Sequence, residues 1–161
     1  DLFMKKIKKL SLMLSLASLV FLVGCATVDE IVIEPFDKSV TVETDFEDVW
    51  STLVRFMSTN DISIQTIEKD SGLIALRGEN LSVAVIRQLC DAQAGLFAAI
   101  NSGGATGSIT VVDDDGFITV NVNTRFTATY YNAMSNPPTY STRNCNSRGQ
   151  FEKSVLNSIT D

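Results

Sequence analysis

The sequence contains no histidine, and its 161 residues include only three cysteines. Without imidazole, Ser-His-Asp and Cys-His nucleophilic systems and histidine-liganded zinc are excluded. The chain also lacks the GxGxxG, GxxxxGK[ST] and GxSxG motifs. We therefore expect no catalytic residue, no metal site and no cofactor. A carboxylate pair brought together by folding is the catalytic alternative that the sequence leaves open.

The acidic run Asp113–Asp115 before Gly116 has the composition of a calcium loop. Such a loop needs a bidentate glutamate at its twelfth position, and that position is Thr124 here. A solvated hairpin turn is the interpretation that we retain.

Long apolar runs are scarce, and the longest is Leu10–Val23, which only three serines interrupt. A helix needs about 20 apolar residues to cross a bilayer, so this run is short for a membrane span. Four lysines precede it and Gly24-Cys25 follows it. This order is typical of a signal peptide, which we expect to comprise residues 1–24.

Leu22-Val23-Gly24-Cys25 resembles the lipobox of bacterial lipoproteins. The resemblance implies that Cys25 becomes the mature N-terminus and carries palmitate or similar acyl chains. Ala26 follows where inner-membrane lipoproteins have aspartate, so the resemblance implies the outer membrane, with the protein on its periplasmic face. An ordinary secretory signal with a chance cysteine is the alternative.

The expected mature chain is acidic, because the leader removes four lysines and one aspartate and leaves 9 basic and 18 acidic residues. Such a chain repels phosphate backbones and anionic headgroups, so we expect no nucleic acid partner. Membrane attachment then depends on the N-terminal lipid rather than on a basic surface.

After a tether at residues 25–37, in which a strand at 30–34 remains open, residues 38–161 are predicted to form one α+β domain. Apolar stripes and capping boxes predict helices over 44–57, starting with the Thr44–Glu47 box, and after the Ser147–Gln150 box to Ile159. Alternating residues predict strands at 38–43, 62–67, 73–77, 108–112, 117–131 and 139–144.

The strand at 117–131 alternates apolar and polar residues along its length. We therefore predict an antiparallel sheet with both helices on one face. Residues 81–107 are the least certain part of this prediction. Residues 81–89 fit either a strand or a helix, and the glycines of 101–107 predict a loop.

Cys90 and Cys145 remain once Cys25 is lipidated, and an even pair in an oxidising compartment predicts a disulfide. It would close a loop of 55 residues. On chain-entropy grounds such a bond stabilises the fold by about 4 kcal/mol.

The segments Phe46–Trp50, Ile62–Ile64 and Asp70–Ile74 resemble the helix-grip domains of the BamC (NlpB/DapX) lipoproteins. The resemblance implies a non-enzymatic, envelope-assembly accessory that binds a protein partner of the cell envelope. Helix-grip folds also hold apolar molecules between helix and sheet, so a carrier of a small hydrophobic ligand or lipid is the alternative. For such a groove the candidates are Trp50, Phe126 and Tyr130, which could equally belong to the core.

Overall fold

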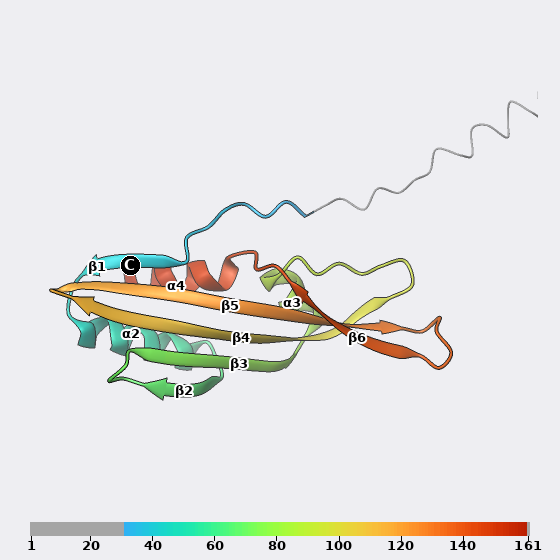
Figure 1. The fold of residues 1–161 in the computed structure, drawn as a ribbon, viewed down its shortest axis with the longest axis horizontal. Helices are drawn as coiled ribbons and strands as arrows, with labels where there is room; N and C mark the ends of the chain where they lie inside the picture. The colour runs from blue at the N-terminus through green and yellow to red at the C-terminus, as the bar shows by residue number, and fades with distance from the viewer. Residues whose placement is uncertain (1–30, 161) are drawn as a thin grey trace, which may run out of the picture. The chain divides into compact units, whose positions relative to one another are not determined.

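The computed structural model describes residues 31–160 (Figure 1). The predicted signal peptide and Cys25 lie outside these residues. The domain from Ile33 onward has the predicted α+β class, with one antiparallel six-stranded sheet. Its elements are β1 (Ser39–Glu43), α2 (Phe46–Thr59), β2 (Ile64–Glu68), β3 (Leu73–Leu81), α3 (Val83–Leu89), β4 (Ala99–Asp114), β5 (Phe117–Asn132), β6 (Thr139–Cys145) and α4 (Gln150–Thr160).

The strands lie in the order β1-β5-β4-β3-β2, and β6 also pairs with β5. Two strands thus share one edge of β5: β1 pairs with residues 117–121, and β6 pairs with residues 126–132. The long β4–β5 hairpin forms the centre of the sheet, and the shorter strands flank it (Figure 1).

The helix predicted after the first strand is confirmed as α2, and its buried residues recur at three- and four-residue steps: Val49, Trp50, Leu53 and Met57. The predicted capping box at its start is wrong. The N-cap residue is Asp45, whose side chain makes no capping hydrogen bond, and Glu47 instead pairs with Lys69 at 2.6 Å. Burial of the apolar stripe therefore holds this helix without the predicted cap.

The prediction that one sheet face is covered is confirmed along β5. Ile118, Val120 and Val122 are fully buried, whereas the polar residues between them are partly or fully exposed. On the uncovered face, hydroxyl groups pair across strands: Thr41 with Thr119 at 2.9 Å and Thr129 with Thr142 at 3.0 Å.

Between residues 81 and 107 the structure both resolves and corrects the sequence prediction. Residues 83–89 form helix α3, whose N-cap Ser82 accepts a hydrogen bond from the Val85 amide. The described part of the chain therefore has three helices rather than two. Residues 31–37 form no strand.

The loop predicted at residues 101–107 is wrong, because these residues belong to β4. Their glycines permit close packing rather than a turn. A Cβ atom on Gly103 would lie 2.2 Å from Ile86 of α3, and one on Gly107 would lie 2.7 Å from the Asn123 carbonyl oxygen. Only glycine fits at such distances.

The buried side chains form two hydrophobic clusters on the helix-covered face. The first cluster lies between α2, α4 and the sheet: Val49, Trp50, Leu53, Met57, Ile74, Leu76, Ile109, Val111, Ile118, Val120, Val122, Val155 and Leu156. The second cluster includes α3: Ile86, Cys90, Ala92, Ile100, Phe126 and Ala128.

Candidate functional site

An apolar groove of about 320 Å³ adjoins both hydrophobic clusters. Leu76 of the first cluster and Phe126 of the second both line it. The remaining lining residues come from the α2–β2 connection, β3, α3, β4, β5 and α4: Asn60, Asp61, Ile62, Ser63, Arg77, Gly78, Leu81, Val85, Leu89, Ala105, Thr106, Gly107, Thr124 and Phe151.

Small residues form the floor of the groove. Gly78 of β3 pairs with Ala105 of β4, and Gly107 of β4 pairs with both Leu76 and Thr124. Paired residues of neighbouring strands share a face, so these small side chains lie together on the helix-covered side. The floor is recessed here because glycine or alanine occupies three neighbouring positions, Gly78, Ala105 and Gly107, between the larger Leu76 and Phe126.

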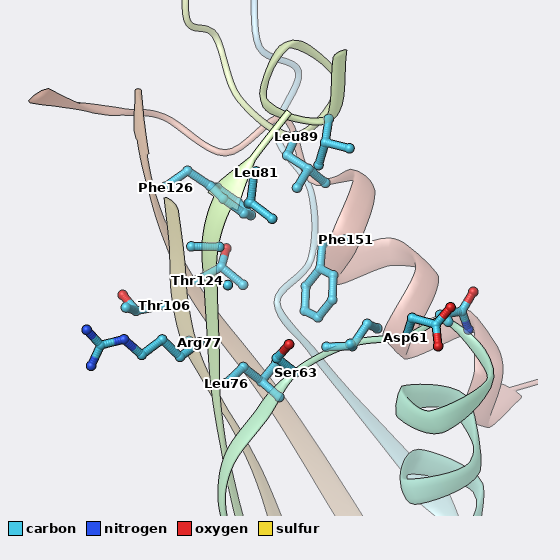
Figure 2. A pocket seen from close by; sticks show the side chains of 16 residues that line it. Asp61, Ser63, Leu76, Arg77, Leu81, Leu89, Thr106, Thr124, Phe126 and Phe151 are labelled. Atoms are coloured by element: carbon cyan, nitrogen blue, oxygen red, sulfur yellow. The ribbon is translucent and has the colours of Figure 1, made fainter. Parts of the chain in front are cut away.

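Large apolar side chains form the walls. In Figure 2 the ring of Phe151 extends from α4 toward the sheet, and Leu81, Leu89 and Phe126 close one end of the space. Phe126 is 2% exposed, so it belongs to both the core and the groove wall. These walls suit an apolar occupant.

The charged side chains that border the groove, Asp61 and Arg77, lie at its rim. Arg77 and Thr106 extend away from Phe151 in Figure 2, and the Arg77 Nε atom donates to Glu79 Oε1 at 2.7 Å. Asp61 and Ser63, both exposed, lie at the other side, after the end of α2. Asp61 therefore places a carboxylate at the mouth of the groove.

A buried carboxylate fixes the α4 wall. Glu152 is 0% exposed, and its Oε1 atom accepts a hydrogen bond from the Thr124 hydroxyl of the groove floor. Its Oε2 atom accepts one from the Ser147 hydroxyl at 2.9 Å. The Ser147–Gln150 capping box is thus replaced by a Ser147–Glu152 contact. Because Phe151 precedes Glu152, these bonds also position the wall of the groove.

The predicted disulfide between Cys90 and Cys145 is present, and it joins the end of α3 to the end of β6. The backbones around it also pair, because the Asp91 amide donates to the Asn146 carbonyl at 3.1 Å. The Arg148 amide donates to the Leu89 carbonyl at 2.9 Å. The α3 wall is thereby tied to the sheet and to α4.

Of the three aromatic residues predicted for a groove, Phe126 lines it and the other two do not. Trp50 is 7% exposed in the first cluster and stacks on Phe46 with ring centroids 5.7 Å apart. Tyr130 packs against the second cluster, below the Arg143 guanidinium. Trp50 is therefore a core residue, and Tyr130 is a half-buried residue at the edge of the second cluster.

Sequence reasoning missed the floor of the groove and Phe151. One signal for the floor is present in the sequence: Gly103, Ala105 and Gly107 place small residues at every second position. Small residues at a period of two mark one recessed face of a strand. The prediction of a loop at residues 101–107 overlooks this pattern.

Asp113 acts as a turn residue, because its Oδ1 atom accepts a hydrogen bond from the Gly116 amide at 3.2 Å. Across residues 31–160 no group of three or more histidine, cysteine, aspartate or glutamate residues could hold a metal ion. Over the same residues no helix is long and apolar enough to cross a membrane.

No protein-family model matches this chain, and no curated protein sequence is detectably similar to it.

Proposed function

We propose that this protein binds a small apolar ligand in the groove between the sheet, α3 and α4, on a domain anchored to the outer membrane by lipid at Cys25. It acts as a carrier and not as an enzyme. The observation that carries the proposal is the apolar cavity of about 320 Å³ with its recessed floor. Ligand pockets of proteins have volumes of about 300–1,000 Å³.

The volume of the groove limits the size of the ligand. If each heavy atom occupies roughly the 30 Å³ of a liquid water molecule, the groove holds on the order of ten heavy atoms. A short acyl chain or a single substituted ring has this size. A complete phospholipid does not fit, although one end of an acyl chain does.

The charged residues at the rim determine which polar group the ligand can carry. The Asp61 carboxylate lies at the mouth, and Arg77 is turned away toward Glu79. A ligand carboxylate would be repelled by Asp61, because like charges destabilise each other at short range. The groove therefore favours neutral or cationic amphiphiles over fatty acid anions.

Isothermal titration calorimetry of the full chain with octanol and with octanoate tests this proposal. We expect octanol to bind with a negative heat-capacity change, and octanoate to bind more weakly by about tenfold. The variant Val85→Phe fills the groove from α3 and should abolish binding. Val112→Phe, at an exposed valine that does not line the groove, is the matched control. Equal binding by both variants would refute the site.

A second proposal is the protein-binding accessory role that the resemblance to BamC lipoproteins implies. The uncovered sheet face supports it, because Asn123 and Arg125 are exposed there beside Asn121. Purification of the acylated protein from its membranes should then recover an envelope protein partner. Alanine substitutions at these three residues should release that partner, and retention of every partner would exclude this face.

A further inference from the structure

Four of the large exposed apolar side chains lie at one end of the domain, which we call the tip: Leu96 (89% exposed), Phe97 (60%), Met134 (74%) and Tyr140 (64%). Leu96 and Phe97 precede β4, Met134 lies in the β5–β6 connection, and Tyr140 is in β6. The exposed side chains therefore come from two separate stretches of the chain.

Strand register brings these stretches together. Ala99 of β4 pairs with Tyr131 of β5, which pairs with Tyr140 of β6. The rings of Tyr131 and Tyr140 are in contact, with centroids 5.1 Å apart. Figure 1 shows the loop before β4 and the β5–β6 connection at the same end of the sheet, opposite the β4–β5 turn.

The tip carries no charge in an otherwise acidic protein. Residues 92–112 and 126–142 contain no aspartate, glutamate, lysine or arginine. At about 3.4 Å per residue, the nearest charges behind it on β5 and β6 are Arg125 and Arg143, about 20 and 10 Å from Tyr131 and Tyr140. The acidic residues Asp113–Asp115 lie at the opposite end of the β4–β5 hairpin.

The N-terminal part of the described chain also runs toward this half of the sheet. Lys38 bonds to Val122 of β5, and Ile33 lines a cleft together with Asn144–Ser147, which follow β6. The chain therefore enters the domain beside the middle of β5, at the end of β6 that lies away from the tip. Cys25, the predicted acylated residue, lies only eight residues before Ile33.

We infer that the tip lies in the headgroup region of the lipid bilayer to which the protein is anchored. Transfer of exposed leucine, phenylalanine and methionine side chains from water to acyl chains is favourable. Tyrosine is enriched at membrane interfaces. The Arg143 guanidinium, which lies over the Tyr130 ring behind the tip, would be the basic group nearer the headgroups. The acidic turn at the other end would face away from the membrane. The inference rests on the anchoring part of the proposed function and not on the groove.

The test uses the full acylated chain, reconstituted in phosphatidylcholine vesicles whose acyl chains carry bromine, which quenches tryptophan emission at contact. Phe97→Trp places an indole at the tip. Phe117→Trp places one at the acidic end of the same hairpin, at a phenylalanine that is 52% exposed. Trp50, buried in both variants, gives a constant background.

We expect the indole introduced by Phe97→Trp to lose on the order of half its emission, because an interfacial side chain reaches about 5–10 Å into the bilayer boundary. The one introduced by Phe117→Trp should be unaffected. Adding Leu96→Asp should reverse most of the quenching, and adding Val112→Asp should not.

Two outcomes would overturn the inference. Equal quenching at both ends would mean that the domain has no preferred orientation on the bilayer. Absence of quenching at both ends would mean that the tip does not enter the bilayer. Neither outcome involves the groove, so the octanol titration tests the groove independently of the tip.

Discussion

The two hydrophobic clusters lie on one face of one sheet, yet they are stabilised differently. The first contains thirteen buried residues between two helices and the sheet, and it includes no disulfide. The second contains six, and one of them is Cys90, which is bonded to Cys145. The covalent bond adds its stabilisation to that of the smaller cluster.

The difference also explains the groove. Leu53 and Met57 of α2 fill the space above the sheet in the first cluster and are fully buried. Between that cluster and α3, the sheet presents Gly78, Ala105 and Gly107. Side chains of α3 and α4 border the space above these small residues but do not fill it. An unfilled space between two ordered clusters is the structural basis of the proposed binding site.

The largest effect should follow from removing the disulfide by Cys90→Ser with Cys145→Ser. Loss of the cross-link over 55 residues should lower the free energy of unfolding by about 4 kcal/mol. Urea unfolding measures this change. Amide hydrogen exchange should accelerate more in α3 and β6 than in α2. Uniform acceleration would show that the two clusters are not separate units.

The next largest effects should come from truncating leucines, and the loss of unfolding free energy should differ between the first cluster and the groove. Leu53→Ala opens a cavity in the filled first cluster and should lower the free energy of unfolding by about 3 kcal/mol. Leu89→Ala removes a half-buried side chain that already borders the groove, so about 1 kcal/mol is expected. Equal losses in urea unfolding would contradict the unequal packing.

Gly103→Ala tests the close contact of α3 with the sheet. The added Cβ would lie 2.2 Å from Ile86 and 2.6 Å from the Thr127 carbonyl oxygen. Overpacking of this kind lowers the free energy of unfolding by about 2 kcal/mol. The control is Gly95→Ala, where no atom lies within 4 Å, and its stability should be unchanged or slightly raised.

The smallest effect concerns Glu152, which lies beneath the α4 wall. In Glu152→Gln, one of the two hydroxyl donors, Thr124 or Ser147, faces an NH₂ group and loses its acceptor. The expected destabilisation is about 1 kcal/mol. The exposed Glu79→Gln should stay within about 0.5 kcal/mol in the same thermal unfolding measurement.

Much of the fold could be predicted because its signals are local. The apolar stripe of α2, the hairpins and the alternation along β5 each depend on neighbouring residues. The pairing of Cys90 with Cys145 was predictable for a different reason, because only two cysteines remain in the described domain.

The groove was not predictable, because its parts are distant in sequence. Gly78, Thr124 and Phe151 meet only through strand register and the placement of α4. Glycine is typical both of turns and of close packing, so composition alone does not distinguish the glycines of β4 from those of a loop. Trp50 is a candidate by residue type, but it lies on the face of α2 that packs into the first cluster.

The most direct test of the account is to observe where a bound ligand lies. In nuclear magnetic resonance spectra of the full chain with octanol, we expect nuclear Overhauser contacts between the methylene protons of octanol and the ring protons of Phe126 and Phe151. No contact to Phe46 or Trp50 is expected, because these rings pack in the first cluster. Contacts confined to Leu96 and Phe97 at the tip, or the absence of any contact, would contradict a ligand site between the two clusters.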